Sequence, residues 1–352
     1  MTLKAIAITL GDAAGIGPEI IAKAFRDAPQ ALQGCFVAGD VAAMRRACRL
    51  IGGIPLPVVQ ISAPQQAWEA PPHSVAVLQV GPPMAEVPLG RVSAQAGEMA
   101  GRCLVWAAQA ALRGEVAALV TAPLHKEALA AAGPPYAGFP GHTEILQAQA
   151  GVFLNLPLNQ VPVRMMLAND ELRVVLVSIH MALRDAIEAV TYDNVLQTLR
   201  VTDAALRAQL GRRPRLAVAG LNPHAGEGGL FGREELDTIL PAISAAQAQG
   251  VDAQGPFAPD TVFMRARGGE FDAVVAMYHD QGLIPVKYLG VEQGVNVTLG
   301  LPLVRTSPDH GTAFDIAGTG KADASSLLAA IRMARRLAGE SATATGHGMA
   351  SA

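Results

Sequence analysis

Short apolar runs that end in polar, chemically active residues recur along this chain, and they constrain its fold more than any other feature. Four of them have the length and the Val, Leu and Ala content of buried strands: Ala117–Thr121, Leu172–Ile179, Leu216–Gly220 and Ala273–Met277. Segments with helical spacing alternate with these runs, including Ser93–Arg113, Asn194–Ala208, Glu234–Ala248 and Lys321–Leu337. This alternation predicts a parallel or mixed sheet with helices on both faces, the α/β/α class.

The stretch from Phe271 to Asp315 concentrates the polar groups that could form a functional site. Its candidates are His279, Asp280, Lys287, Asn296 and Arg305, and it closes on Asp309-His310-Gly311-Thr312-Ala313. Ligands of open α/β sheets bind beyond the carboxyl ends of the strands, so polar residues directly after a buried strand are site candidates. Ordinary solvated loop residues would explain one such strand end, but the pattern recurs after four strands.

The composition indicates a globular chain with a large buried core. The 352 residues are enough for two domains, and 51% hydrophobic against 16% charged residues argues against disorder. A net charge of -3 gives no reason to expect a nucleic acid or an anionic membrane as a partner. Since no apolar run reaches the roughly 18 residues of a membrane span, the mean hydropathy of +0.29 indicates extensive burial, including a subunit interface.

The cysteines and the N-terminal segment both favour a cytoplasmic protein. Cys35, Cys48 and Cys103 have neither metal-ligand nor redox spacing, and their odd number suits a reducing compartment. The apolar run near the N-terminus is too short for the core of a signal peptide, and it predicts a first strand over Lys4–Leu10 instead.

A glycine-rich turn follows this first strand. It covers Gly11–Glu19 and leads into the helical pattern Ile20–Phe25, so backbone N–H groups at the helix start could cradle a phosphate. The spacing is neither G-x-G-x-x-G nor that of a Walker loop, however. A purely structural tight turn explains the sequence equally well, and both interpretations stay open.

Three histidines share a position directly after an apolar strand pattern. They are His180, His224 and His279, and their separations match no local metal-binding motif. Three imidazoles with an open coordination position suit a catalytic divalent cation such as Zn²⁺. The alternative is three unrelated loop histidines, and spacing alone does not decide between the two.

Four long motifs give the chain a family resemblance. The sequences YHDQG (278–282), VNVTLGLP (295–302), RTSPDHGTA (305–313) and GLNPHAGEGG (220–229) resemble the 4-hydroxythreonine-4-phosphate dehydrogenase family. The similarity runs from about Ala7 to Met333, nearly the whole chain. The family includes close relatives that act on other substrates, so the resemblance specifies the chemistry better than the substrate.

The resemblance implies a particular two-domain architecture. The fold would be a two-domain α/β/α fold similar to isocitrate and isopropylmalate dehydrogenases, which explains the absence of a Rossmann fingerprint. We expect a first domain of residues 1–135 plus 300–340, and a second domain of residues 136–299 that carries the metal ligands and the dimer contacts. Residues 341–352 are expected to form a disordered tail.

The resemblance also implies a reaction. It is the NAD- or NADP-dependent oxidation of 4-phosphooxy-L-threonine to a β-keto acid, which loses CO2 to give 3-amino-2-oxopropyl phosphate in pyridoxal phosphate biosynthesis. One alternative keeps this chemistry but uses D-threonate or D-erythronate 4-phosphate, or a cyclic cis-diol carboxylate. Another is a non-redox acyltransferase on a related fold, which the three histidines and the cations Lys287 and Arg305 make the weaker hypothesis.

The family motifs assign roles to individual residues. The substrate would contact His142, Thr143, Lys287, Asn296 and Arg305, and proton transfer would involve Lys287, Asp280 and Asp260. One divalent ion per site (Zn, Mg, Mn or Co) would be held by His180, His224 and His279, with one ligand supplied by the partner subunit of a homodimer with shared active sites. The cofactor would lie on His310, Gly311, Thr312 and Ala313, in a loop similar to the adenosine-binding loop of isopropylmalate dehydrogenases.

The chain departs from the family pattern at a few positions. Ala13, Ala182 and Phe314 stand where the related families have proline, and none of these changes removes a functional group. Gly151–Val161 is interpreted as a small local insertion without an assigned function, and Gly255–Asp260 is predicted to be a loop.

Overall fold

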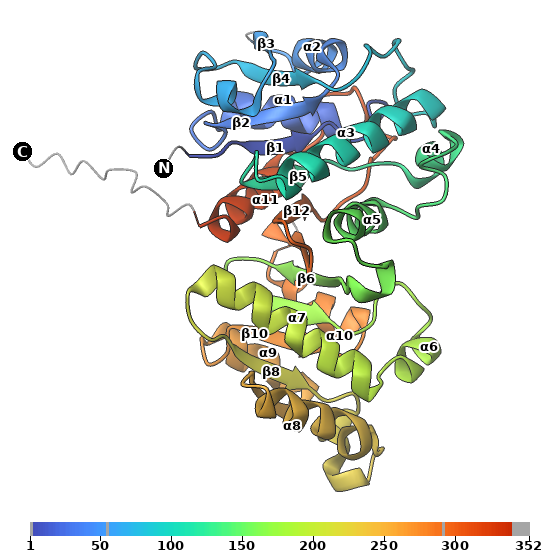
Figure 1. Ribbon diagram of the computed structural model, residues 1–352, viewed down its shortest axis with the longest axis vertical. Coiled ribbons are helices and arrows are strands. Elements are labelled where there is room, and N and C mark those ends of the chain that lie inside the picture. Colours follow the sequence, from blue (N-terminus) through green and yellow to red (C-terminus); the bar gives the residue numbers. More distant parts are fainter. Residues whose placement is uncertain (1–2, 54–55, 291–292, 340–352) are drawn as a thin grey trace, which may run out of the picture.

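A single sheet of 12 strands runs through the molecule from end to end (Figure 1). The computed structural model describes residues 3–53, 56–290 and 293–339. In spatial order the strands are β3 (Val58–Ile61), β4 (Val75–Gln79), β2 (Cys35–Gly39), β1 (Ile6–Thr9), β5 (Ala118–Thr121), β12 (Arg305–Pro308), β11 (Val295–Leu299), β6 (Arg164–Ala168), β7 (Arg173–Leu176), β10 (Ala273–Ala276), β8 (Arg215–Ala219) and β9 (Asp252–Phe257).

The sheet consists of two parallel groups of strands with an antiparallel centre. From β3 to β12 every neighbouring pair is parallel, and so is every pair from β7 to β9. Between these groups, β11 pairs antiparallel with β12 and β6, and β6 pairs antiparallel with β7. The two groups therefore run in opposite directions, and each presents its own set of strand ends to a ligand.

Helices cover both faces of each group, which confirms the predicted α/β/α class (Figure 1). The α-helices are α1 (Gly17–Asp27), α2 (Val41–Leu50), α3 (Ala94–Leu112), α4 (Lys126–Ala131), α5 (His142–Leu154), α6 (Leu183–Glu188), α7 (Tyr192–Leu210), α8 (Leu240–Ala248), α9 (Pro259–Arg267), α10 (His279–Tyr288) and α11 (Ser325–Leu337). Short helices are η1 (Pro64–Trp68), η2 (Leu158–Gln160), η3 (Pro223–Gly229) and the π-helix η4 (Glu235–Ile239).

Burial explains why the strands are nearly continuous apolar runs. All residues of β1, β5 and β10 are buried, as expected for parallel strands that are covered by helices on both faces. The helices bury one face each: in α11, Leu327, Ile331 and Ala334 are buried at helical spacing while Arg332 and Arg336 are exposed.

The structure corrects one sequence-based expectation and adds elements that the sequence analysis did not predict. The segment Gly255–Asp260 is not a loop, because β9 ends at Phe257 and α9 begins at Pro259. The segment Gly151–Val161 contains the last turn of α5 and the short helix η2. The strand β6 has no counterpart among the predicted strands, and its central position creates the antiparallel part of the sheet.

The domain boundaries stay a prediction. The helix α5, which the proposed division at residue 135 assigns to the second domain, packs against α3 of the first strand group. The tail at 341–352 lies outside the described residues. Within the described part of the chain, no helix is long and apolar enough to cross a membrane.

Candidate active site

A buried guanidinium marks the junction between the two halves of the sheet. Arg305, the first residue of β12, is only 4% exposed. Its Nε and Nη2 donate to Thr121 Oγ1 at 3.1 and 2.7 Å, and Nη1 donates to Thr298 Oγ1 at 3.0 Å. No described carboxylate pairs with it. Buried charges in proteins are ordinarily paired, so this cation is equipped to receive an anionic ligand.

The charge of Arg305 persists despite its burial. Burial lowers the pKa of this guanidinium to about 10, and the carboxylate of Glu144 opposes that shift. The side chain is therefore protonated at neutral pH. Glu144 itself, in the first turn of α5, makes no hydrogen bond or ion pair with a described residue. The sequence-based site did not include Glu144, Thr121 or Thr298.

The neighbouring His142 is a neutral imidazole with a defined tautomer. Its Nε2 lies 3.2 Å from the carbonyl oxygen of Ala122, directly after β5. Burial, and then the nearby Arg305 cation, lower the pKa of His142 to about 3. Because the carbonyl can only accept, Nε2 carries the proton, and Nδ1 is left as an acceptor for a substrate hydroxyl.

Thr143 and Asn296 also keep free hydrogen-bonding groups. Thr143 lies inside the first turn of α5, whose N-cap is Gly141, so its side chain does not cap the helix. Asn296 is half-buried in β11, between Leu167 of β6 and Ser307 of β12. Neither side chain is hydrogen-bonded to a described residue, and both remain available to a ligand.

Lys287 has a partner within the chain. Its Nζ lies 2.8 Å from Asp309 Oδ2. This contact is an ion pair without hydrogen-bond alignment, since the same carboxylate oxygen has no hydrogen-bond partner among the described atoms. The lysine is 39% exposed and the aspartate 14%. An anionic substrate would therefore compete with Asp309 for this ammonium group.

Two of the three candidate metal ligands meet in one chain. His180 follows β7 and His279 follows β10, and because β7 and β10 are parallel neighbours, the two rings lie 5.5 Å apart between centroids. Burial, with His279 and Lys126 nearby, lowers the pKa of His180, which favours the neutral ring that a metal requires. His279 Nδ1 donates to Asp280 Oδ1 at 2.7 Å, which leaves Nε2 free.

His224 lies apart from this pair. It follows β8, the other neighbour of β10, but its ring packs near Phe231 at 6.2 Å between centroids. Among the described residues, no group of three or more His, Cys, Asp or Glu side chains is placed to hold a metal. The described chain thus brings His180 and His279 together, and His224, the third predicted ligand, lies apart from them.

The loop that carries His224 is held in a strained left-handed conformation. His224, Ala225 and Glu227 have φ values of 53°, 52° and 44°, although none of them is glycine. Left-handed backbone costs a non-glycine residue roughly 1–2 kcal/mol, and such strain is concentrated at functional sites. The energy must come from contacts that hold the loop in place.

A buried carboxylate supplies these contacts. Glu235 is 2% exposed, and its Oε1 accepts the backbone N–H groups of Leu221 and Asn222 at 2.7 Å each. Its Oε2 accepts from Asn222 Nδ2 at 3.0 Å. Glu235 begins the π-helix η4, a type of element that is frequently found at functional sites. Sequence periodicity treated it as an ordinary helical residue.

Glu235→Gln is expected to lower the free energy of unfolding by about 1.5–3 kcal/mol, the worth of hydrogen bonds to a charged group. The NH2 group of the new glutamine could also face the NH2 group of Asn222, so that two donors would meet. Urea unfolding measures the change, and Glu69→Gln at an exposed position is the matched control. Equal stability of the two variants would show that Glu235 does not hold the loop.

The proton-transfer candidates differ in how closely the structure ties them to the histidines. Asp280 contacts His279 directly, as a residue that orients a metal-ligating imidazole would. Asp260 lies in the first turn of α9, which packs against η3, the element that carries His224. The Asp260 carboxylate makes no hydrogen bond or ion pair with a described residue.

The predicted cofactor loop packs against the glycine turn after β1. The carbonyl of Thr312 accepts the N–H of Ile16 at 3.0 Å, and a side chain at Gly15 would lie 2.9 Å from the Thr312 side chain. Ala313 has a φ of 40°, His310 is exposed, and Gly311 has open space beside its Cα. The glycine turn therefore supports this loop, whichever ligand it binds.

Two further polar residues lie beside this loop. The Asp12 carboxyl is fully buried, its Oδ2 has no described partner, and burial raises its pKa. His125, after β5, stacks on Phe314 with ring centroids 4.5 Å apart. Both residues follow predicted strands, and neither is among the predicted site residues.

Comparison with known proteins identifies the family. The family model described as pyridoxal phosphate biosynthetic protein PdxA matches residues 31–334. The chain is 51% identical to 4-hydroxythreonine-4-phosphate dehydrogenase from Beijerinckia indica, over 94% of both chains. It is 45% identical to D-threonate 4-phosphate dehydrogenase from Salmonella typhimurium, over 96% of this chain and 100% of the relative.

A solved structure gives the same answer for the fold. The 4-hydroxythreonine-4-phosphate dehydrogenase from Klebsiella pneumoniae is 44% identical and superposes with a TM-score of 0.85, covering 96% of this chain and 98% of that one. The predicted fold and the predicted family are thereby confirmed. Since the family model and these relatives each span most of the chain, the protein belongs to the PdxA family of dehydrogenases, oxidoreductases that act on a CH–OH group.

Proposed function

We propose that this protein oxidises 4-phosphooxy-L-threonine with NAD or NADP and releases 3-amino-2-oxopropyl phosphate for pyridoxal phosphate biosynthesis. In this reaction the secondary alcohol gives a hydride to the nicotinamide and a proton to the protein. The resulting β-keto acid loses CO2, and a proton replaces the carboxyl group. The observation that carries the proposal is the buried, unpaired Arg305 beside a neutral His142, in a chain of this family.

The substrate has two anionic groups and a hydroxyl, and the chain offers complementary partners. Arg305 provides a buried cation, and Lys287 provides a second cation that now faces Asp309. Asn296 and Thr143 have free polar groups, and His142 Nδ1 is an acceptor. These groups would bind and orient the substrate. Lys287, Asp280 and Asp260 remain the candidates for moving protons.

The histidine pair is suited to a divalent cation. His180 is neutral, and His279 has one ring nitrogen bonded to Asp280 and the other free, the arrangement typical of metal-ligating histidines. His180 and His279 would therefore hold a Zn, Mg, Mn or Co ion, with His224 as the third ligand. When bound, such an ion stabilises a negatively charged oxygen on the substrate.

The cofactor is proposed to lie on His310, Gly311, Thr312 and Ala313. Gly15 and Ile16 contact Thr312 of this loop and support it. Gly311 has open space beside its Cα, so a ligand could approach the backbone closely there. The three buried cysteines form no disulfide bond with one another, which agrees with a cytoplasmic setting for this chemistry.

A second candidate substrate is D-threonate 4-phosphate. It is favoured by the 45% identity to a dehydrogenase of that name, a value close to those of several 4-hydroxythreonine-4-phosphate dehydrogenases. The two substrates differ at C2, which bears an ammonium group in one and a hydroxyl in the other. The family assignment gives no support to the acyltransferase alternative.

A substrate panel tests the proposal. The purified protein is supplied with a divalent metal and NAD or NADP, and NADH or NADPH formation is followed by absorbance. We expect turnover with 4-phosphooxy-L-threonine and release of CO2. Exclusive turnover of D-threonate or D-erythronate 4-phosphate would favour the second candidate, and no turnover of any phosphorylated hydroxy acid would refute the proposal.

Neutral replacement of the two substrate cations gives a further prediction. Arg305→Met or Lys287→Met should raise the Michaelis constant for the phosphorylated substrate about tenfold or more, because each loses a charge-assisted bond. Lys321→Met, at an exposed site on the same chain, is the control and should leave the constant unchanged. An unchanged constant in the Arg305 variant would remove this residue from the substrate site.

We further propose a homodimer with shared active sites. One chain brings only two of the three histidines together, so its metal site is incomplete unless His224 moves or a partner supplies it. Apolar side chains are also exposed near these elements, among them Met181, Leu183, Leu230 and Phe231. Such residues are suited to an interface that covers them.

A further inference from the structure

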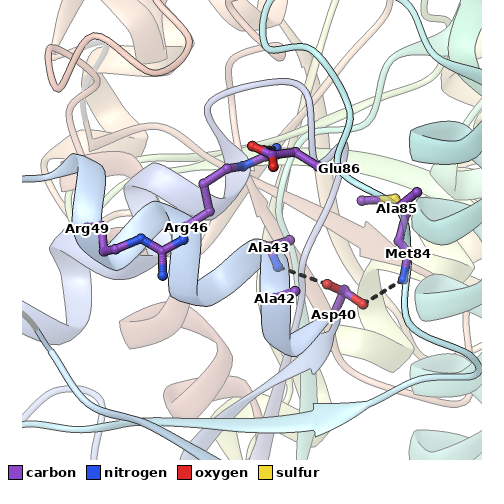
Figure 2. A pocket seen from close by; sticks show the side chains of 8 residues that line it. All are labelled: Asp40, Ala42, Ala43, Arg46, Arg49, Met84, Ala85 and Glu86. Atoms are coloured by element: carbon purple, nitrogen blue, oxygen red, sulfur yellow. Dashed lines mark hydrogen bonds and ion pairs between the residues drawn. The ribbon is translucent and has the colours of Figure 1, made fainter.

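A cavity of ≈ 120 Å³ lies between the start of α2 and the segment that follows β4 (Figure 2). It is lined by Asp40, Ala42, Ala43, Arg46, Arg49, Met84, Ala85 and Glu86. The strands β4, β2, β1 and β5 are parallel neighbours, so this cavity shares a sheet edge with the glycine turn after β1 and with His125 after β5. None of the roles proposed above uses it.

The buried carboxylate of the cavity, Asp40, already accepts hydrogen bonds from within the chain. Asp40 is 1% exposed. Its Oδ1 accepts the N–H of Ala43 at 2.8 Å, which caps α2, and its Oδ2 accepts from Met84 N at 3.0 Å and from Gln79 Nε2 at 3.1 Å. Figure 2 shows Asp40 between these two segments, away from the arginines. Its charge is thus directed at backbone and amide donors.

The positive charges of the two arginines in the cavity are not strongly paired with carboxylates of the described chain. Arg46 donates to the carbonyls of Ala13 at 3.1 Å and Val87 at 3.0 Å, and it forms a long ion pair with Glu86 at 3.4 Å. Glu86 is 81% exposed, so this pair is weak and easily exchanged. Arg49, one helical turn further along α2, forms no hydrogen bond or ion pair with a described residue. An anion could therefore bind between the two guanidinium groups.

The cavity shares two lining residues with a second, smaller cavity, which lies at the glycine turn that supports the predicted cofactor loop. A second cavity of ≈ 10 Å³ shares Ala43 and Arg46 with the first, and its lining also includes Gly15 and Gly318. Gly15 is the residue that supports Thr312, and Gly318 lies a few residues beyond Ala313. Arg46 also donates to the carbonyl of Ala13 in the same turn, so the turn contacts both this arginine and Thr312 of the 310–313 loop.

We propose that this arginine cavity binds the 2′-phosphate of an NADP adenosine, and thereby allows the enzyme to use NADP. The inference rests on the proposed cofactor placement and extends it. The guanidinium fork matches phosphate oxygens, and NAD has no charge at that position.

Adenine nucleotides that lack the nicotinamide test the proposal by calorimetry, without any turnover. Adenosine 2′,5′-bisphosphate should bind the unmodified enzyme about tenfold more tightly than 5′-AMP, since one charge-assisted contact corresponds to about that factor. Arg49→Gln should abolish this difference while leaving 5′-AMP binding unchanged. Arg45→Gln is the matched control, because Arg45 is an exposed cation on the same helix that does not line the cavity.

A variant at Glu86 should change the nucleotide preference in the opposite direction. Glu86→Gln removes the anion that now pairs with Arg46, so it should increase the preference for adenosine 2′,5′-bisphosphate over 5′-AMP. Equal binding of the two nucleotides by the unmodified enzyme, no binding of either, or an equal loss in the Arg45 and Arg49 variants would each overturn the proposal. If the binding preference holds while no phosphorylated hydroxy acid is turned over, the proposed reaction fails and the phosphate subsite stands.

Discussion

Replacing His279 by alanine is expected to remove the bound divalent cation and to lower turnover by at least about a hundredfold, since even residues that only orient a metal ligand cost 10–100-fold. His180→Ala should act in the same way, because the two rings lie together at 5.5 Å and neither alone forms a site. Elemental analysis after dialysis measures the metal content of each variant, and NADH formation measures the turnover.

The control for this prediction is His73→Ala. His73 is an exposed loop histidine with a φ of 58°, and it has no role in the proposed site. This variant should keep the metal and the activity of the unmodified enzyme. Full turnover by the enzyme after chelation, with no metal detected, would show that the histidine pair serves another purpose.

The sequence was sufficient to single out His180 and His279, whose rings lie together in the structure, because strand ends are local features. Apolar strand patterns directly before His180 and His279 predicted that each histidine lies at the end of a strand. These patterns can be recognised without any tertiary information. Their actual contact depends on the order of the strands, since β7 and β10 are far apart in sequence and adjacent in the sheet. That order follows from the packing of the whole chain, which no local pattern encodes.

The residues that the sequence did not reveal act through long-range or non-periodic contacts. Thr121 binds a guanidinium 184 residues away, and no spacing rule connects a threonine to a distant arginine. Glu235 occupies an ordinary helical position in the pattern, but it is buried and accepts the N–H groups of a left-handed turn. The strand β6 was not predicted because its five residues, which include an arginine and two methionines, lack the pattern typical of a strand.

The glycine turn after β1 had two open interpretations, and the structure favours a supporting role. Gly11 has a φ of 70°, and a side chain there would lie 2.4 Å from the carbonyl oxygen of Pro123. Gly15 touches Thr312 in the same manner. Only glycine permits both approaches, so the turn joins the ends of β1, β5 and β12 into one surface on which a cofactor can lie.

Activity is expected to return when two inactive variants are mixed: His224→Ala, and the double variant His180→Ala/His279→Ala. The one-chain pairing of His180 with His279 makes His224 the ligand that a partner would supply. In a mixed dimer, one site then has His180 and His279 from the first variant and His224 from the second, and the other site has none of the three.

The size of the recovery follows from the two-fold symmetry. Random exchange of equal amounts makes half of the dimers mixed with one intact site each, so activity should reach about one quarter of that of the unmodified enzyme. Each variant alone should stay inactive, and differently tagged subunits allow the exchange to be confirmed by co-purification. If exchange is complete and no activity returns, all three histidines act within one chain. The strained loop of His224 would then have to bring its ring to His279, the first residue of α10, which follows the neighbouring strand β10.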